Sequence, residues 1–382
     1  MIVEHPRSKS PATSTVIIIC PGGLENGGGI GRQMGYFLQG RRTTETAIDY
    51  RIIDSRGPWF LGASPVHIGF AGFYLLGAAV KLCGTRLQGA HCIVHVNITG
   101  RGSTIRKVIL LAFVRALRLQ YILHVHDYDY AEEYRRRGSI MKGLIKSSFR
   151  KSAKVLVLGD RERARLSELL GLRESQILVL PNAVPDPIVN ISAARKSGRP
   201  CHLLFLGHLS ARKGVPELLR ALASPALADR PWRATLAGGG SIDEFRRLAN
   251  ELGIADRIDL PGWLGADGVR ALCTDADVLV LPSHAEGLAM AVLEGLSYGL
   301  AVVTTPVGAH PEVIEPEVSG IMVPAGDVEA LASALARVID DDCLRERLRA
   351  GARRRFLEKF DVRTYAERLG ELHANLLSGA GT

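Results

Sequence analysis

The 382-residue sequence lacks most features of a secreted, disulfide-bonded or zinc-binding protein. Its six cysteines form no CxxC pair and no zinc spacing, and most lie inside apolar runs, so we expect buried free thiols in a reducing compartment. Residues 1–15 contain no apolar segment of the kind found in a signal peptide. The longest apolar run, Val66–Leu82, is interrupted by His67 and three glycines. Its length is at the short limit for a membrane span, so we expect a buried or membrane-facing helix there.

The signatures of dinucleotide and metal sites are also missing or weak. Neither of two glycine-rich segments, GGLENGGGIGR and GGGSID, satisfies the GxGxxG pattern, which disfavours hydride transfer. His124 and His126 point to the same side of an expected strand, but no second Cys/His cluster with suitable spacing accompanies them. A DxD pattern at Asp127–Asp129 recurs at Asp275–Asp277, so the pattern is common by chance. We therefore expect no metal site.

The net charge of +9 is distributed unevenly along the chain. Residues 1–185 hold 26 Lys/Arg against 13 Asp/Glu, a balance of +13, whereas residues 186–382 hold 22 against 26, a balance of −4. A basic half joined to a mildly acidic half indicates that the first half meets an anionic partner. Nucleic acid, an anionic membrane and a phosphorylated substrate all fit this balance.

The most basic segment is Arg135–Lys154, with eight basic residues and no acid. Read as a helix, it places Ile140, Leu144 and Ile145 on one face, which is typical of a basic helix that lies on a membrane surface. A solvated surface helix is the alternative. The segment contains one phenylalanine and no series of aromatic residues for stacking, which disfavours nucleic acid.

Short β-branched strands alternate with helical stretches along the chain, which predicts an α/β fold with parallel sheets. The alternation begins with the strand Ser14–Gly22, is interrupted by a proline-rich linker near residues 182–198, and restarts with the strand at residues 202–210. We therefore expect two similar domains, residues 1–185 and 186–360. Ligands of such sheets bind at the carboxyl ends of the strands, so the cleft between the domains is the expected site.

Two acids stand in the segment HAEGLAMAVLEGLSYG, with seven residues between them. Glu286 lies in the turn after the expected strand Ala276–Ser283, and Glu294 lies about two turns into a helix that we expect to begin near Leu288. The free N–H groups of that helix start form an anion site, and Gly287 allows close approach. The order of hydroxyl acceptor, anion site and hydroxyl acceptor matches the sugar, diphosphate and ribose of a nucleotide-sugar. A capping acid plus one exposed helix acid is the structural alternative.

A second motif, FLGHLSARKG, ends the first strand of the second half and places Lys213 in a loop beside Gly214. A cation at this point could meet a diphosphate, and an ordinary exposed lysine is the alternative. The segments LAGGG and Gly262–Gly265 end the next two strands, where backbone could meet a base.

Taken in order, these motifs resemble glycosyltransferase family 4. The resemblance rests on GHLSARKG, LAGGG, PGWL, the E-x7-E pair and TTPVGAHPEVI in the second half. It extends to PGGLENGGGIGR, LHVHDYDYAEEY and VLPNAV in the first half, and the likeness is greatest to members that build bacterial polysaccharides. It implies the GT-B fold, in which two Rossmann-like parallel-sheet domains face each other across a cleft, and a retaining, metal-independent transferase. We expect the first domain to bind the acceptor, the second to bind the nucleotide-sugar, and a C-terminal helix in residues 361–382 to pack back towards the first.

The resemblance also implies roles for individual residues. Glu286 would contact the donor sugar, Glu294 would bind the ribose, and Lys213 would neutralise the diphosphate. His126 would end its strand facing the donor sugar, and Leu264 would lie near the base. The full expected donor site comprises Gly28, Gly29, Gly207, His208, Arg212, Lys213, Leu264, Glu286, Gly287, Leu288 and Glu294, with Glu286, Lys213 and His126 as catalytic residues. The expected acceptor site comprises Asn97, Arg101, Ser103, Arg106 and His126.

One position departs from the family pattern, because His208 stands where an arginine is usual. A neutral imidazole supplies less positive charge to the leaving group, and Arg212 could compensate. The resemblance implies transfer of a hexose to a hydroxyl of a lipid-linked glycan, at the cytoplasmic face of the membrane, without a cofactor. An epimerase or phosphorylase of the same fold and a non-catalytic nucleotide- or glycan-binding protein remain alternatives.

Overall fold

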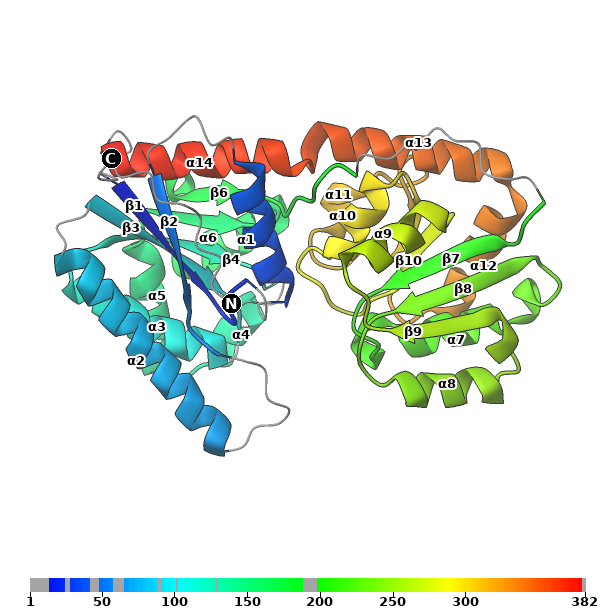
Figure 1. Cartoon of the computed structure of the whole chain (residues 1–382), viewed down its shortest axis with the longest axis horizontal. Helices are drawn as coiled ribbons and strands as arrows, with labels where there is room; N and C mark the ends of the chain where they lie inside the picture. The colour runs from blue at the N-terminus through cyan, green and yellow to red at the C-terminus, as the bar shows by residue number, and fades with distance from the viewer. Residues whose placement is uncertain are drawn as a thin grey trace.

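The computed structural model describes residues 14–24, 28–41, 48–57, 65–87, 91–100, 102–127, 130–187 and 198–379. These residues form two α/β halves, each built on a six-stranded parallel sheet (Figure 1). The GT-B fold class expected from the sequence is therefore confirmed.

The first sheet has the strand order β2-β1-β3-β4-β5-β6. Its order reverses between β1 and β3, and such a switch point places a crevice at the carboxyl ends of the two strands. Residues 16–20 of β1 are fully buried between helices on both faces, as its unbroken β-branched sequence predicts. The strands are β1 Ser14–Cys20, β2 Ile48–Asp54, β3 His91–Ile98, β4 Gln120–Val125, β5 Lys154–Val157 and β6 Ile177–Val179.

Helices cover both faces of the first sheet. One face packs against α2, α3 and α5 through a core that includes Leu111 and Phe149, and the other packs against α1 and α14 through Phe37 and Leu369. The helices of this half are α1 Gly28–Gly40, α2 Pro65–Leu87, α3 Gly102–Ala116, α4 Tyr130–Arg135, α5 Ser139–Arg150 and α6 Asp160–Leu170, with the 3₁₀ turn η1 Glu174–Gln176.

The second sheet has the order β12-β11-β10-β7-β8-β9, with its switch point between β7 and β10. The strands are β7 Cys201–Leu206, β8 Trp232–Ala237, β9 Ile258–Gly262, β10 Val278–Leu281, β11 Ala301–Thr304 and β12 Ile321–Met322. The helices are α7 Val215–Leu222, α8 Ile242–Glu251, α9 Ala266–Asp275, α10 Met290–Ser297, α11 His310–Val313, α12 Val328–Asp340, α13 Asp342–Lys359 and α14 Val362–Ser378, with 3₁₀ turns η2 Ala211–Lys213, η3 Pro225–Leu227 and η4 Ala255–Arg257.

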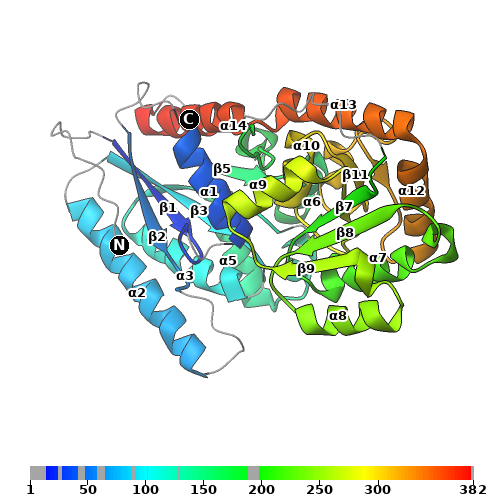
Figure 2. The same ribbon diagram turned by 45° about the vertical axis from the view of Figure 1, so that its right-hand side comes forward.

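The last two helices join the halves. Helix α13 packs on the second sheet, and α14 continues from it across the first half, so the two run along one side of the molecule (Figures 1 and 2). Tyr365 and Leu369 of α14 lie in the same core cluster as Val16 and Phe37. The chain crosses between the halves at a second point, where Val184 pairs with Asp361 in a parallel bridge.

The structure changes two expectations about helices of the first half. Arg135–Lys154 is not one helix, because α4 ends at Arg135 and α5 begins only at Ser139. Ile145 does not share an outer face with Ile140, since Ile145 is 1% exposed and Ile140 is 84% exposed. Helix α2 spans the apolar run, and among the described residues no helix is long and apolar enough to cross a membrane.

Candidate active site in the interdomain cleft

A tight turn after β7 positions Lys213. The turn ends at Gly214, whose φ of +73° is in the left-handed region that favours glycine. A Cβ atom at Gly214 would lie 2.1 Å from the backbone oxygen of Pro282, at the end of β10. The turn is therefore pressed against the neighbouring strand end, and this brings Lys213 to the switch point of the second sheet.

Glu286 is the centre of a compact polar group at this switch point. Its Oε1 atom forms an ion pair with Lys213 Nζ and accepts a hydrogen bond from the Ser283 hydroxyl at 2.8 Å. Arg212 Nη1 lies 3.9 Å from the other carboxylate oxygen. Glu286 is 7% exposed, so these side chains, and not water, surround its carboxylate.

Helix α10 begins directly after this group, at Met290 and not near Leu288 as expected. Glu294 consequently lies one turn into the helix, where the sequence predicts two. The residue before α10, Ala289, offers no side-chain cap, and its own N–H donates to Nε2 of His310 at 3.4 Å, so an imidazole and not a carboxylate lies at the helix start. Acid, helix start and second acid therefore follow one another along α10, in the order that the sequence predicts.

An arginine that sequence reasoning missed completes this arrangement from the other half. Arg32 of α1 donates from Nη1 to Glu294 Oε1 at 2.8 Å, across the cleft. Burial raises the pKa of Glu294, and the adjacent Arg32 acts against that rise. The glycine-rich turn before α1 drew attention in the sequence, but no spacing linked Arg32 to an acid 262 positions away.

The two halves touch closely around the start of α10. A Cβ atom at Gly287 would lie 2.7 Å from the backbone oxygen of His126, and one at Gly29 would lie 3.8 Å from Met290 Cγ. Asn182 donates from Nδ2 to the backbone oxygen of Leu288 at 3.1 Å. The expected donor residues Gly29, Gly287 and Leu288 therefore meet at this contact between halves.

His126 directly follows β4 at the cleft and is held by Asn97 of β3. Asn97 donates from Nδ2 to Ile19 O at 3.1 Å, so its Oδ1 faces His126 Nε2 at 2.8 Å and accepts its proton. This fixes the tautomer of His126 and leaves its Nδ1 as the acceptor. Burial lowers the pKa of His126 to about 3, so the ring is neutral at physiological pH. Because Asn97 is fully buried, it does not face the cleft itself, and its effect there is the orientation that it gives to His126.

Further histidines line up behind His126. The rings of His124 and His126 are tilted by 35° with centroids 4.0 Å apart. His124 hydrogen-bonds to His95, which hydrogen-bonds to His373 of α14. Tyr50 contacts the far nitrogen of His373 at 3.2 Å. Burial lowers the pKa values of His95, His124 and His373, so these rings are neutral. The sequence pointed to His124 and His126, but their partners on β3 and α14 carry no local signal.

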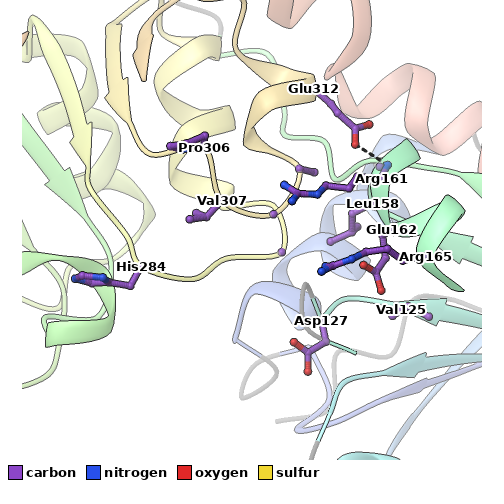
Figure 3. Close-up of a pocket in the computed structure, with 14 residues that line it drawn as sticks. Val125, Asp127, Leu158, Arg161, Glu162, Arg165, His284, Pro306, Val307 and Glu312 are labelled. Carbon is purple, nitrogen blue, oxygen red and sulfur yellow. Dashed lines mark hydrogen bonds between the residues drawn. The ribbon is translucent and has the colours of Figure 1, made fainter. Parts of the chain in front are cut away.

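A cavity of about 280 Å³ lies between the halves next to Gly287. Figure 3 shows Arg161 and Arg165 of α6 extending towards it, opposite Val307 and His284. Glu312 closes one side, where it accepts from the backbone N–H groups of Asp160 at 2.6 Å and of Arg161 at 3.0 Å.

The remaining expected site residues lie on both sides of the cleft. His208 is exposed after β7, next to Gly207, and Leu264 is half-buried after β9. Gly28 is the first residue of α1, and Ser103 and Arg106 lie in the first turns of α3. Arg101 and Asp129 lie outside the described residues.

The two DxD patterns have structural partners. Asp127 accepts from the backbone N–H of Gly100 at 2.7 Å, and Asp277 accepts from that of His202 at 2.8 Å. Asp275 forms ion pairs with Arg199 and Arg233. Within the described part of the chain, no group of three or more His, Cys, Asp or Glu side chains is placed to hold a metal ion.

Comparison with known proteins finds one family over the second half. Residues 190–355 match the family described as "Glycosyl transferases group 1". The chain is 24% identical over 300 residues to the alpha-D-kanosaminyltransferase of Streptomyces kanamyceticus, which covers 74% of this chain and 77% of that protein. Further curated relatives are matched over 40–57% of their length.

Solved structures share the fold of the whole chain. The sucrose-phosphate synthase from Thermosynechococcus elongatus superposes with a TM-score of 0.74 at 20% identity, over 96% of this chain and 100% of that one. Anabaena HepE in complex with UDP superposes with a TM-score of 0.70 at 16% identity, over 95% of this chain and 100% of that one.

Proposed function

Residues 190–355 match the group 1 glycosyltransferases, and from this match we propose that the chain is such an enzyme and transfers a hexose from a nucleoside diphosphate to a hydroxyl group of a lipid-linked glycan. The family is retaining, so the new glycosidic bond keeps the configuration of the donor. The observation that carries the proposal is the row formed by Glu286, the start of α10 and Glu294, with Lys213 on the first acid and Arg32 on the second. UDP is the first candidate for the nucleotide, because HepE was solved with it.

Each part of the row has a distinct task in this reaction. The donor diphosphate lies at the start of α10, where N–H groups and the Lys213 ammonium stabilise the negative charge that develops on the leaving group. The carboxylate of Glu294 accepts hydrogen bonds from the ribose hydroxyls. Glu286 and the neutral His126 hold the sugar hydroxyls, so the reacting carbon is fixed beside the acceptor. The leaving phosphate takes the acceptor proton, as the family resemblance implies.

A nucleotide-release assay with a panel of nucleotide-sugars tests this function. One donor should release its nucleoside diphosphate, and the rate should rise when a membrane extract supplies the acceptor. Mass spectrometry of the lipid fraction then identifies the added hexose. A protein that binds UDP but releases no nucleotide with or without extract would contradict the proposal, and a product that stays a nucleotide-sugar would indicate an epimerase.

We further propose that the first half docks on an anionic membrane, so that a lipid-linked acceptor of bacterial polysaccharide assembly reaches the cleft from its inner face. Three neighbouring helices, α2, α3 and α5, cover one face of the sheet and expose large apolar side chains. These are Phe73, Leu76 and Val80 on α2, Ile109 on α3, and Ile140 and Leu144 on α5. Apolar side chains with nearby lysines are typical of a helix surface that enters the headgroup layer.

The structure sharpens which basic residues matter for this docking. Arg135 and Arg136 form ion pairs with Glu132 of α4, so their charge is partly compensated. Lys142 and Lys146 lie on α5 itself, next to the exposed Ile140 and Leu144. These two lysines are therefore the better candidates for contact with anionic lipid, each contributing about 1 kcal/mol near the surface.

Liposome flotation with and without anionic lipid tests the docking surface. The double variant Lys142→Gln with Lys146→Gln should float less than the wild type, and the matched double variant Arg135→Gln with Arg136→Gln should change flotation less. Added salt should release the protein, because charges are screened over about 8 Å at physiological ionic strength. Equal flotation of all three proteins, or none by any, would favour a soluble acceptor.

A further inference from the structure

Cationic side chains gather at the carboxyl end of the first sheet, on α3 and after β2. Lys107 of α3 is 1% exposed, and its Nζ donates to the hydroxyl of Ser55. Arg106 of α3 and Arg56 are half-buried beside it and close enough for their charges to act on one another. We call Arg56, Arg106 and Lys107 the basic cluster.

The acid that faces the basic cluster is engaged elsewhere. Asp54 accepts hydrogen bonds from the backbone N–H groups of Gly22 at 2.7 Å, Arg56 at 2.8 Å and Gly57 at 3.0 Å. Its carboxylate thus organises the loops after β1 and β2. Among the described residues, Asp54 is the carboxylate that acts on Arg56, Arg106 and Lys107, and it is shared with three backbone N–H groups. An anion at the face of Arg106 would therefore add an acceptor that Asp54 does not supply.

Titration behaviour agrees with this geometry. Burial, together with the charges of Arg106 and Arg56, lowers the pKa of Lys107 to about 7, although Cys20 and Asp54 act in the opposite direction. Burial also lowers the pKa values of Arg56 and Arg106. The side chains are held close together although their charges repel.

Two polar atoms of α3 beside the cluster have no hydrogen-bond partner within the described residues. They are the Oγ of Ser103 and the Nε of Arg106, and both are buried. Ser103 is 8% exposed, and it precedes Arg106 by three positions, so the two side chains lie on the same face of the helix. Buried donors without partners cost stability, and an anion at this face would accept from both.

The cluster lies on the same side of the first half as the residues that precede and begin α1. Asp54 binds Gly22 at the start of that turn, and α1 begins at Gly28 at its end. Gly29 of α1 faces Met290 at the start of α10. An anion on the basic cluster would therefore lie on the side of the first half, near Gly22, while the donor diphosphate would lie at the start of α10.

We propose that Arg56, Arg106 and Ser103, with Lys107 behind them, bind a phosphate or diphosphate group carried by the acceptor. The inference rests on the proposed function, because it takes the acceptor to enter from the first half. The anionic group belongs either to a lipid-linked diphosphate or to a soluble phosphorylated sugar, which share the chemistry that this site recognises. The site positions an acceptor whose hydroxyl then lies in the cleft.

Calorimetric titration of inorganic pyrophosphate into the UDP-saturated protein tests the site, because UDP occupies the donor position. Arg106→Gln and Arg56→Gln should each weaken pyrophosphate binding by about tenfold or more, the usual loss for a hydrogen bond between charged groups. Arg51→Gln is the matched control, since Arg51 also lies on β2 but pairs with Asp49 within the strand. Affinity should fall as the pH rises above about 7, because the bound anion favours the charged form of Lys107.

Equal pyrophosphate binding by the wild type, Arg106→Gln and Arg51→Gln would overturn the site, because binding would then depend only on the overall positive charge of the first half. If pyrophosphate binding depends on Arg106, a hexose monophosphate and a polyprenyl diphosphate are compared as competitors, and the stronger one identifies the source. The proposed function is judged separately by UDP binding and nucleotide release. If Arg106→Gln transfers the sugar at an unchanged rate, the anion site is wrong and the proposed function stands. If pyrophosphate binding depends on Arg106 but no nucleotide is released, the anion site stands and the proposed function is wrong.

Discussion

Two helix N-termini face the interdomain cleft, and they differ in what lies on them. At α6, the carboxylate of Glu312 from the other half accepts from the N–H groups of Asp160 and Arg161. At α10, the preceding Ala289 supplies no side-chain cap, and its N–H donates to the ring nitrogen Nε2 of His310 at 3.4 Å, so no carboxylate takes the place that Glu312 takes at α6. The N–H groups of α6 are thus used to join the halves, whereas those of α10 remain for a ligand.

Glycine precedes both helices, with a different purpose at each. A Cβ atom at Gly159 would lie 2.6 Å from Glu312 Oε1, so this glycine admits the carboxylate that caps α6. A Cβ atom at Gly287 would lie 2.7 Å from the His126 backbone oxygen, so this glycine allows the backbone that follows β4 to approach. A glycine before a helix therefore does not by itself mark an anion site, and the neighbouring charged groups decide its use.

Removal of Lys213 should produce the largest effect, because it takes the cation from the phosphate end of α10. Lys213→Ala should lower kcat by about 10² to 10³-fold, the usual loss when one group that stabilises developing charge is removed. The measurement is nucleotide release at saturating donor, with circular dichroism to check folding.

Arg212→Ala is the control for this prediction. Arg212 is adjacent in sequence, but its side chain is 54% exposed and lies 3.9 Å from Glu286. Its loss should lower kcat by about tenfold at most. Equal losses from the two variants would mean that general positive charge, and not the placement of Lys213, supports the reaction.

Glu294→Ala should weaken nucleotide binding more than it slows chemistry. Loss of a hydrogen bond from a charged group costs about 1.5–3 kcal/mol, or roughly 10–150-fold in affinity. Calorimetry with UDP measures this directly, and kcat at saturating donor provides the comparison. An unchanged affinity would remove Glu294 from the ribose site and leave it as the partner of Arg32 alone.

Local patterns predicted the fold and the order of Glu286, helix start and Glu294, because strands, turns and the E-x7-E spacing can be recognised within short segments of the sequence. The order of Glu286, helix start and Glu294 needed no long-range contact, although the helix begins two residues later than expected. The partners of these residues come from distant segments, as Arg32 does for Glu294 and His373 does for His95. Such contacts depend on how the halves and α14 pack, which periodicity and spacing do not encode.

The exposed surface of the first half was predicted less well for the same reason. Helical periodicity placed Ile140 and Ile145 on one face, but a break at residues 136–138 sets the start of α5. The sheet then takes Ile145 into the core and leaves Ile140 outside. The acid-free segment also has acidic partners just upstream, which a window that begins at Arg135 does not include.

Glu312→Ala should affect stability and leave nucleotide binding unchanged, which would separate α6 from α10 experimentally. Loss of a helix cap costs about 1 kcal/mol of the unfolding free energy. Denaturant unfolding followed by circular dichroism measures the loss, and Glu329→Ala is the control, since Glu329 lies in the first turn of α12 while Asp327 provides the cap. A tenfold change in UDP affinity for Glu312→Ala would show instead that α6 belongs to the donor site.

Chelation of metal ions should have the smallest effect of all. The start of α10 already has positive charge on both sides, from Lys213 on Glu286 and from Arg32 on Glu294. Asp127 and Asp277 accept from backbone N–H groups, which gives the acids of the DxD patterns a structural use. The rate of nucleotide release should therefore stay within about twofold in excess EDTA. A loss that Mg²⁺ or Mn²⁺ restores would show that a divalent cation neutralises the diphosphate, and Asp127→Asn would then be the variant that tests whether this acid holds the ion.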